Sequence, residues 1–289
     1  MSLIDAATLA HLQSWTGKTE TRLDQLTLGP VRALAATLDR HDSEPCHGDC
    51  LPPLWHWLYF LPIARLSEVG PDGHPKRGGF LPPVPLPRRM WAGGKLQWHR
   101  PLHLGEEVQR VSCIEKVQHK SGRSGELVFV QVVHRISNAS GLCLEETHDI
   151  VYRSAMPSDQ ATSTRVKPTH LAQWQQDIVP DDVLLFRYSA LTFNSHRIHY
   201  DRRYVTQVEG YPGLVVHGPL MATLMVDLIR RNSERDLQSF EFKAIKPVFE
   251  CADQRVLRVC AHPQDKQVHA WIQDHEGDVC MQATALWSA

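Results

Sequence analysis

The sequence predicts an α+β fold built from two similar units in tandem, each with an antiparallel sheet wrapped around a helix. Three observations predict this fold. Strand-like segments fall into two groups of four, at 95–153 and 239–288; a long apolar helix is expected at 217–231; and both halves present their elements in the same order. An apolar helix that is followed by antiparallel strands can bury its stripe if the sheet wraps around it.

The first group of strands follows a proline-rich segment. "GGFLPPVPLPRRMWAG" (78–93) carries four prolines between positions 82 and 87, which excludes a regular helix there. Four segments with strand character come next: "KLQWHRPL", "EEVQRVSCIEKVQ", "ELVFVQVVHRI" and "LCLEETHDIVYR". They are separated by the turn signals "HLG", "KSGRSG" and "SNASG", so an antiparallel meander is predicted.

A polar segment separates the two halves. Residues 156–180 are rich in Ser and Thr at first and are bounded by Pro157 and Pro180, a composition typical of a connection between domains. We therefore expect a first unit at 1–155, a linker at 156–180 and a second unit at 181–289.

The second unit is expected to begin with a short helix in "FRYSALTFNSHR" (186–197) and to continue with a longer one. Gly218 and Pro219 suit the start of that longer helix, and Arg230 and Arg231 suit its end. Its apolar residues recur with helical spacing: Leu220, Met221, Leu224, Met225, Leu228 and Ile229. The predicted strands are "SFEFKAIKPVFE", "QRVLRVCAH", "KQVHAWIQD" and "GDVCMQATALWS".

The order of elements indicates an internal repeat. "VRALAATLDRHD" (31–42) resembles 186–197 in pattern, and "LPPLWHWLYFLP" (51–62) occupies the place of the helix that begins near 216. Each half thus has a short helix, a loop, a longer helix and four strands. Two such units can join their sheets edge to edge, which is the architecture of a double hot-dog.

The composition limits the classes of binding partner that are expected. The formal net charge of -1 provides no long-range field for nucleic acid or anionic lipid, and 42% hydrophobic with 22% charged residues is typical of a folded domain. No apolar run is long enough to cross a bilayer, since "LPPLWHWLYFLPIARL" is interrupted by prolines and a histidine. We expect binding to neither nucleic acid nor membrane.

The N-terminal sequence and the cysteines suggest a compartment. "MSLIDAATLAHLQSWTGKTETRLDQL" lacks a basic region followed by an apolar block, so a cytoplasmic location is expected. The seven cysteines form no C-x-x-C unit and are expected to be reduced thiols. "CHGDC" (46–50) lacks a second pair of ligands at finger spacing, and we interpret it as a loop, without a metal site.

One nine-residue stretch carries the chemistry: "FNSHRIHYD" (193–201). Together with the helix start "VHGPLMATLMVDLIRR", it resembles the hydratase segment of the MaoC-like, (R)-specific enoyl-thioester hydratases. The resemblance is greater to the branch that contains hydroxyacyl-thioester dehydratase type 2 and the itaconyl-CoA and mesaconyl-C4-CoA hydratases. "PLPRRMWAGG" and "LQWHRPL" resemble the first half of that branch, so the likeness begins at about residue 20.

The resemblance implies four catalytic candidates. His199 falls on the catalytic histidine, and Asn194 falls where many hydratases carry an aspartate. Either His199 is the only base and Asn194 orients the water, which is the arrangement that we favour, or Asp201 supplies the carboxylate. The amide of Gly218 would stabilise the thioester oxyanion at the start of the long helix.

Four more residues are candidates for substrate binding. His196 and His217 lie beside the catalytic candidates in the sequence, and Arg89 and Arg197 could pair with a carboxylate or a phosphate of the substrate. For His196 and Arg197, a place on the surface of a short helix is the ordinary alternative. The first unit has no equivalent motif at "TLDRHDSEP" (37–45), and we expect it to shape the pocket.

We therefore expect a cofactor-free hydro-lyase that acts on an enoyl-CoA thioester, with hydration of itaconyl-CoA or mesaconyl-C4-CoA to citramalyl-CoA as the first choice. A 3-hydroxyacyl-thioester dehydratase of fatty acid metabolism would use the same groups. Two further classes stay open: a non-catalytic hot-dog protein that binds an acyl thioester, and an iron oxygenase with His199, Asp201 and His262 as ligands. Pairing of two chains into a homodimer is also expected to be feasible.

Overall fold

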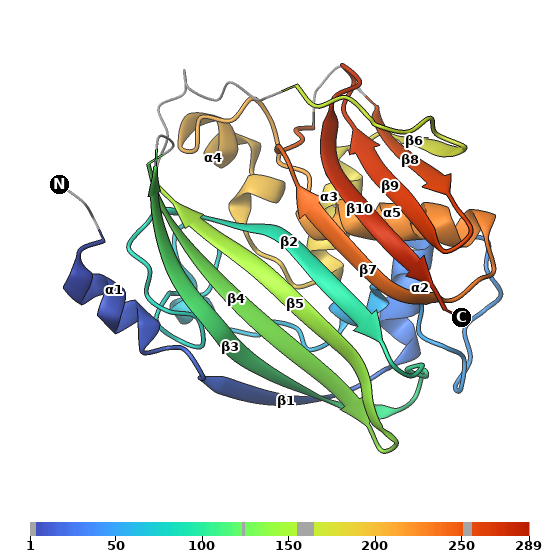
Figure 1. Cartoon of the computed structure of the whole chain (residues 1–289), viewed down its shortest axis with the longest axis horizontal. Coiled ribbons are helices and arrows are strands. Elements are labelled where there is room, and N and C mark those ends of the chain that lie inside the picture. Colours follow the sequence, from blue (N-terminus) through green and yellow to red (C-terminus); the bar gives the residue numbers. More distant parts are fainter. Residues whose placement is uncertain (1–3, 123–124, 155–164, 251–255, 289) are drawn as a thin grey trace.

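A computed structural model describes residues 4–122, 125–154, 165–250 and 256–288 of the chain. Its strands are β1 (Thr19–Gln25), β2 (Arg88–Trp98), β3 (Glu107–Gly122), β4 (Gly125–Asn138), β5 (Gly141–Arg153), β6 (Trp174–Ile178), β7 (Leu237–Ala244), β8 (Leu257–Pro263), β9 (Gln267–Gln273) and β10 (Val279–Trp287). All pair antiparallel in one sheet, in the order β1-β3-β4-β5-β2-β7-β10-β9-β8-β6 (Figure 1).

The two halves of this sheet have the same topology. The first half runs β1-β3-β4-β5-β2 and the second, from its own edge, runs β6-β8-β9-β10-β7. They meet where β2 pairs with β7, with Gly93 opposite Lys243 and Gln97 opposite Ser239. The predicted α+β class and the eight predicted strands are confirmed, and the repeat inferred from element order extends to the order of strands in the sheet.

The sequence-based prediction missed the edge strand of each half. β1 lies in the N-terminal segment, and β6 lies inside the segment 156–180 that was predicted to be a linker. Both are polar, "TETRLDQ" and "WQQDI", and alternate between half-buried and exposed residues without a buried apolar face. An edge strand covers little of the core, so its sequence carries little hydrophobic alternation. The domain boundaries themselves stay a prediction.

Three of the expected helices are present: α2 (Leu28–Thr37), α3 (Asp182–Leu191) and α5 (Gly218–Asn232). Two short helices, α1 (Ala6–Gln13) and α4 (Arg202–Gln207), were not predicted. α5 contacts β6, β8, β9 and β10, and α2 packs against α3 (Figure 1). Asp181 caps α3 by accepting a hydrogen bond from the Leu184 amide, and this cap fixes the residue at which α3 begins.

The longer helix predicted at 51–62 is wrong. That segment contains only a 3₁₀ turn, η1 (Trp55–Leu58), between Leu54 with φ of 70° and Phe60 with φ of 53°. A non-glycine residue in the left-handed region ends a right-handed helix at a cost of about 1–2 kcal/mol. Both residues are buried, so packing of their side chains stabilises the irregular path. The aromatic residues Trp55, Tyr59 and Phe60 of this segment are buried in the core.

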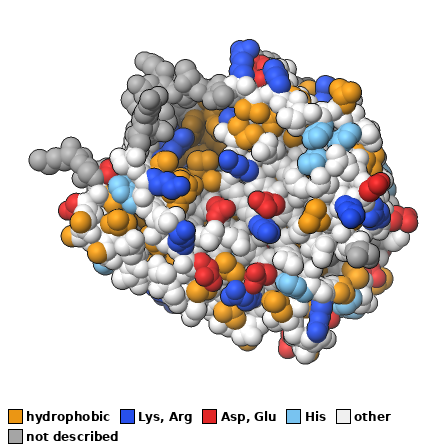
Figure 2. Space-filling view, in the orientation of Figure 1, with side chains coloured by type: hydrophobic (Ala, Val, Ile, Leu, Met, Phe, Trp, Pro, Cys, Tyr) orange, Lys and Arg blue, Asp and Glu red, His pale blue; other side chains and the backbone are white. Residues whose placement is uncertain are grey.

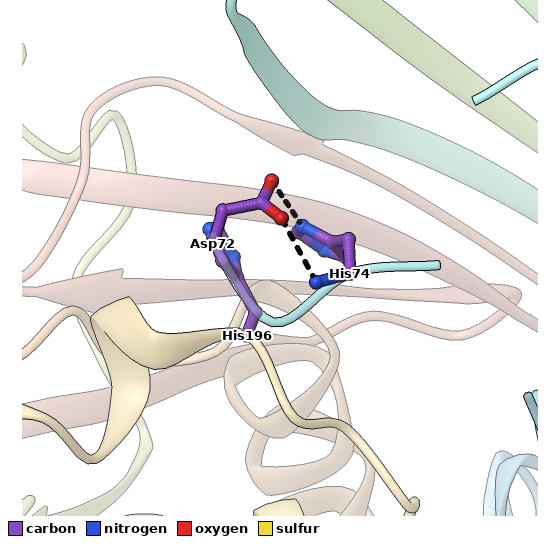
Figure 3. A group of neighbouring side chains, drawn as sticks. All are labelled: Asp72, His74 and His196. Atoms are coloured by element: carbon purple, nitrogen blue, oxygen red, sulfur yellow. Dashed lines mark hydrogen bonds and ion pairs between the residues drawn. The ribbon is translucent and has the colours of Figure 1, made fainter. Parts of the chain in front are cut away.

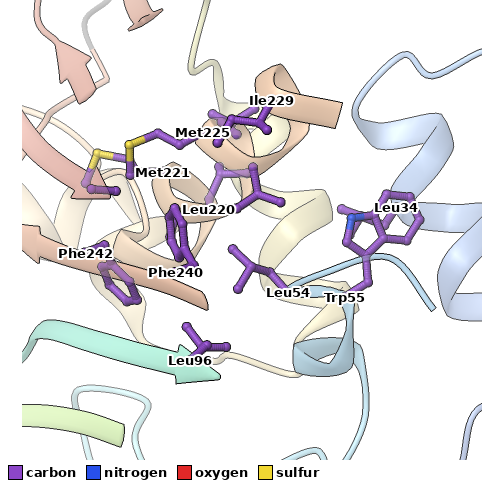
Figure 4. Close-up of a cluster of buried hydrophobic side chains, with 14 of the residues drawn as sticks. Leu34, Leu54, Trp55, Leu96, Leu220, Met221, Met225, Ile229, Phe240 and Phe242 are labelled. Atoms are coloured by element: carbon purple, nitrogen blue, oxygen red, sulfur yellow. The ribbon is translucent and has the colours of Figure 1, made fainter. Parts of the chain in front are cut away.

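One hydrophobic core runs through both halves (Figure 4). Side chains of α5 and β7 meet residues of α2, η1 and β2, among them Leu34, Leu54, Trp55, Leu96, Leu220, Met221, Met225, Ile229, Phe240 and Phe242. Asp227, on α5, is 2% exposed and forms ion pairs with Arg40 of the first half and with Arg231 one turn further along the helix. The two halves therefore share a core and a buried ion pair.

A buried carboxylate lies on the inner face of the first-half sheet. Glu146 on β5 is 2% exposed and accepts hydrogen bonds from Trp57 Nε1 at 2.8 Å and His148 Nε2 at 2.6 Å. His56 Nε2 lies 3.0 Å from its other oxygen. Burial opposes ionisation of this carboxyl, but the two histidines hold the pKa of Glu146 well below its usual value. The carboxylate thus fixes η1 against the sheet.

Two further expectations concern membrane-spanning helices and the state of the cysteines. Within the described residues, no helix has the length and apolar character required to cross a bilayer. The six cysteines that the structure describes are free thiols, as predicted, and Cys251 lies outside the described residues.

Candidate active site

The predicted motif forms a compact turn between α3 and α4. Phe193, with φ of 50°, reverses the chain after α3, and residues Arg197–His199 then form the 3₁₀ turn η4. Asn194 Oδ1 accepts a hydrogen bond from the His196 amide at 3.0 Å. The amide oxygen of Asn194 therefore stabilises the turn that holds the two histidines.

His199 has the features of a general base. The residue is 8% exposed, and its Nδ1 lies 2.7 Å from the carbonyl oxygen of Val215. Since a carbonyl only accepts, the proton is assigned to Nδ1, which leaves a lone pair on Nε2. Burial lowers the pKa of His199 to about 4, although the hydrogen bond to Val215 opposes this shift. The imidazole is therefore neutral at neutral pH and can accept a proton.

The start of α5 lies directly beside His199. The ring of His217, which is fully buried, stacks on that of His199 with centroids 3.7 Å apart and an angle of 18°. His217 Nε2 lies 2.8 Å from Ser189 Oγ on α3, so two helices hold this ring. The next residue, Gly218, is the first of α5, and a Cβ there would meet no protein atom closer than 3.9 Å. Its N–H belongs to the first turn, where no partner exists within the helix.

A loop of the first half, residues 70–75 ("GPDGHP"), docks on the motif. Arg197 N donates to Asp72 O at 2.9 Å, and Ser195 Oγ donates to Gly73 O at 2.5 Å. A Cβ on Gly73 would lie 1.8 Å from the backbone oxygen of Ser195, and its φ is +88°. Only glycine fits this position, because the two backbones are in direct contact.

This loop brings Asp72 and His74 to the motif (Figure 3). Asp72 accepts hydrogen bonds from the His74 amide at 3.0 Å and, through its other oxygen, from His74 Nδ1 at 3.3 Å. The His74 ring packs against that of His196 with centroids 3.8 Å apart. Sequence reasoning missed both residues, because only the fold brings this loop to the motif. The one local signal was a glycine between Asp and His, flanked by two prolines.

Burial and mutual repulsion keep these histidines neutral. The pKa of His196 is lowered to about 2, first by burial and then by the charges of His74 and His199. Burial also lowers the pKa of His74, with Asp72 acting in the opposite direction. Burial opposes ionisation of Asp72, but hydrogen bonds from His74 hold the pKa of Asp72 far below its usual value. The site therefore combines neutral imidazoles with one carboxylate.

Arg89, on β2, is half-buried, and its positive charge lowers the pKa values of His74 and His196. Within the described parts of the chain, no carboxylate forms an ion pair with Arg89, in contrast to its neighbour Arg88, which lies 3.8 Å from Glu209. An arginine of this kind can accept an anionic group of a substrate.

Two predicted site residues are already engaged elsewhere. Arg197 donates to the Asp201 carboxylate through Nε and Nη2, and its Nη1 donates to the carbonyl of Pro71. Asp201 also accepts from the Tyr204 amide and caps α4. Their side chains hold η4, α4 and the 70–75 loop together, so the Asp201 carboxylate is already engaged.

The ligand set of the alternative iron oxygenase does not assemble. His262 lies on β8, with Nδ1 bonded to the carbonyl of Leu171, and in the described residues it does not join His199 and Asp201 in a group that could hold an ion.

A different trio, Asp72, His74 and His196, has one ligand atom of each residue within 4.8 Å of the others. The rings of His74 and His196 are tilted by 40° to each other. Zinc binds an imidazole nitrogen at about 2.0–2.1 Å, along the lone pair in the ring plane. Nδ1 of His74 instead lies 3.3 Å from the Asp72 carboxylate, which also accepts from the His74 amide, so we interpret the trio as a hydrogen-bonded group.

The surface in Figure 2 is hollowed beside the residues drawn in grey. Hydrophobic side chains line the visible walls of this hollow, and Lys and Arg side chains lie around it. A hollow with apolar walls and a basic rim suits a ligand that has an apolar part and anionic groups.

Comparison with known proteins assigns the family. Residues 54–250 match the family model described as hydroxyacyl-thioester dehydratase type 2. The chain is 45% identical over 276 residues to the mesaconyl-C(4)-CoA hydratase of Chloroflexus aurantiacus, covering 95% of this chain and 97% of the relative.

Solved structures support the fold. A MaoC-like dehydratase from Phytophthora capsici superposes with a TM-score of 0.66 at 12% identity, covering 97% of this chain and 98% of that chain. A Mycobacterium tuberculosis protein described as having a double hotdog fold superposes with a TM-score of 0.59 at 12% identity, covering 94% and 96% of the two chains. The predicted double hot-dog is thereby confirmed. Together with the family match, these findings show that the chain is a hydro-lyase that belongs to the hydroxyacyl-thioester dehydratase type 2 family.

Proposed function

We propose that this hydro-lyase adds water to mesaconyl-C4-CoA or itaconyl-CoA to give citramalyl-CoA, or catalyses the reverse reaction. The observation that carries the proposal is the 45% identity to a mesaconyl-C(4)-CoA hydratase across nearly the full length of both chains. The arrangement of His199, Gly218 and Arg89 supports it. A cytoplasmic location and assembly into a homodimer stay predictions from the sequence.

His199 is the base in the proposed mechanism. Its Nε2 lone pair accepts a proton from water as the water oxygen attacks the β-carbon of the enoyl thioester. The electrons of the double bond move to the thioester carbonyl and form an enolate. The imidazolium of His199 then returns the proton to the α-carbon, so that one water is added in total. The hydrogen bond from Nδ1 to the Val215 carbonyl keeps the reactive lone pair on Nε2.

Gly218 stabilises the enolate oxygen. Its N–H lies at the N-terminus of α5, where the helix dipole and an unpaired donor both favour negative charge. The stacking of His217 on His199 places this helix start beside the base. His217 is a positioning residue in this scheme, because its ring is fully buried and bonded to Ser189.

In this proposal, Arg89 selects substrates that have a dicarboxylic acyl group. It has no carboxylate partner in the described residues and lies close to His74 and His196. We propose that its guanidinium pairs with the free carboxylate of the acyl group. Arg197 was also expected to contact the substrate, but its guanidinium is held by Asp201 and Pro71.

The first test follows the ultraviolet absorbance of the enoyl thioester with mesaconyl-C4-CoA, itaconyl-CoA and crotonyl-CoA. His199→Ala is expected to lose activity by about 10²–10⁴-fold. His262→Ala is the matched control, because His262 also bonds to a backbone carbonyl through Nδ1 but lies on β8. Full activity of His199→Ala would exclude His199 as the base.

A second comparison tests the substrate. Arg89→Met is expected to lower kcat/KM for the dicarboxylic substrates by about 10–100-fold, the equivalent of about 1–3 kcal/mol for a charge-assisted hydrogen bond, and to leave crotonyl-CoA little affected. Arg88→Met, at the adjacent position of β2, is the control.

The second candidate function is that of a 3-hydroxyacyl-thioester dehydratase that acts on straight acyl chains, which the description of the matching family model favours. Faster turnover of crotonyl-CoA than of mesaconyl-C4-CoA, together with no effect of Arg89→Met, would select this second function.

A further inference from the structure

We propose that His74 is a second catalytic residue, which binds the attacking water together with His199, and that Asp72 is the positioning residue that fixes the His74 ring. This inference rests on the proposed hydration chemistry and adds residues of the first half of the chain to the site. The motif by itself supplies neither of them.

The contacts of Asp72 define the state of His74. One carboxylate oxygen accepts from the His74 amide at 3.0 Å and the other lies 3.3 Å from Nδ1. A carboxylate that is ionised can only accept, so the proton is assigned to Nδ1 and the lone pair to Nε2. Within the described residues, no group bonds to His74 Nε2. His74 therefore presents an open acceptor, as His199 does.

The rings of the four histidines form successive contacts, and His196 contacts both His74 and His199. Centroids are 3.8 Å apart between His74 and His196, 5.4 Å between His196 and His199, and 3.7 Å between His199 and His217. The side chain of His74 is 22% exposed, whereas the residue His199 is 8% exposed and His217 is fully buried. His74 is thus more exposed to solvent than His199 and His217.

A second acceptor is needed because the attacking water has two O–H bonds. His199 Nε2 takes the proton of one of them. Asn194 Oδ1 already accepts from the His196 amide, and Arg197 holds the Asp201 carboxylate, so the motif offers no free carboxylate for the other. His74 Nε2 accepts a hydrogen bond from the second O–H and orients the oxygen lone pair toward the β-carbon. That hydrogen stays on the oxygen and becomes the hydroxyl of the product, so the atoms balance.

The loop is built to hold His74 there. Arg197 donates to the carbonyls of Asp72 and Pro71, and Ser195 donates to that of Gly73. All three bonds use backbone oxygens of the loop. Changing the side chains of Asp72 or His74 therefore leaves the loop docked, which makes substitutions at these two positions informative.

The experiment compares His74→Gln and Asp72→Asn with a matched pair outside the site. His103 and Glu106 have the same contacts, with the amide at 3.1 Å and Nδ1 at 3.2 Å from the two carboxylate oxygens, but lie between β2 and β3. kcat is measured on whichever of mesaconyl-C4-CoA and crotonyl-CoA the wild type turns over faster. We expect kcat to fall at least tenfold for His74→Gln and Asp72→Asn with KM little changed, and to stay within twofold for His103→Gln and Glu106→Gln.

A readout that does not use substrate separates positioning from loss of structure. In protein labelled with ¹⁵N-histidine, the His74 ring is expected to be the Nδ1–H tautomer, and Asp72→Asn is expected to shift it toward Nε2–H. Free imidazole is expected to restore part of the activity of His74→Gly. A mixture of tautomers in the wild type would overturn the role of Asp72.

The outcomes are distinguishable. Wild-type kcat in His74→Gln, with His199→Ala inactive, overturns this inference and leaves the proposed function intact. Equal losses in His74→Gln and His103→Gln also overturn it, because they indicate a structural effect. Turnover of crotonyl-CoA alone overturns the proposed substrate, while the ratio between the His74 variant and the wild type still decides the role of His74.

Discussion

Gly73 offers a test of how the two halves of the chain build one site. A Cβ at this position would lie 1.8 Å from the Ser195 oxygen and 2.7 Å from its carbonyl carbon, both backbone atoms that cannot rotate away. Gly73→Ala must therefore separate the 70–75 loop from the motif. Gly78→Ala is the matched control, since Gly78 also has a positive φ, +93°, but a Cβ there would approach only Pro83, at 3.7 Å.

The expected magnitude follows from the contacts. A non-glycine residue in the left-handed region costs about 1–2 kcal/mol, and this cost applies to both variants. Separation of the loop also removes three hydrogen bonds to Asp72, Gly73 and Pro71, each contributing about 1 kcal/mol. We expect Gly73→Ala to lower the free energy of unfolding by about 4–5 kcal/mol and Gly78→Ala by about 1–2 kcal/mol.

The assay is urea unfolding followed by circular dichroism, with kcat measured in parallel. If the loop detaches without global unfolding, the stability loss will be smaller, but kcat of Gly73→Ala will still fall because His74 leaves the site. Equal stability and equal kcat for the two variants would refute the close approach of the loop to the motif.

Four other predictions concern buried ionisable groups. The pKa of His199 is about 4 in the folded chain, below its unfolded value of about 6.5, so the unfolded state binds the proton first as pH falls. The free energy of unfolding should therefore drop by about 3 kcal/mol between pH 7 and pH 4. Denaturant titrations at each pH measure this drop. For the same reason, the acid limb of kcat/KM should lie near pH 4, and a limb near 6.5 would contradict the burial of this base. Glu146 accepts from Trp57, His56 and His148, and Glu146→Gln replaces this carboxylate with an amide that also donates. The substitution should lower the free energy of unfolding by about 1–3 kcal/mol, measured by thermal or urea unfolding. An unchanged free energy would show that the side chains around Glu146 rearrange. Asp227→Asn leaves Arg40 without its buried partner and should cost about 3–5 kcal/mol, whereas Asp177→Asn, in an exposed pair with Arg258, should cost less than about 1 kcal/mol.

The sequence by itself determined the elements whose pattern is local. The spacing of Leu220, Met221 and Met225 predicted α5, and alternation between turn signals predicted eight strands, because a helix stripe or a pleated face is written in neighbouring residues. The same order of elements in both halves predicted the double hot-dog. The motif at 193–201 pointed to His199 and to a hydro-lyase of the family that the comparisons assign.

Tertiary structure alone decided what depends on distant segments. It showed that Leu54 and Phe60 interrupt the helix predicted in the first half, and that the polar segments at 19–25 and 174–178 complete the sheet as edge strands. It also brought Asp72 and His74 to a motif more than a hundred positions away, and it engaged Arg197 and Asp201 with each other. The physical reason is the same in each case: the neighbours that fix these residues are far away in the chain, so no local pattern of hydrophobicity or charge records them.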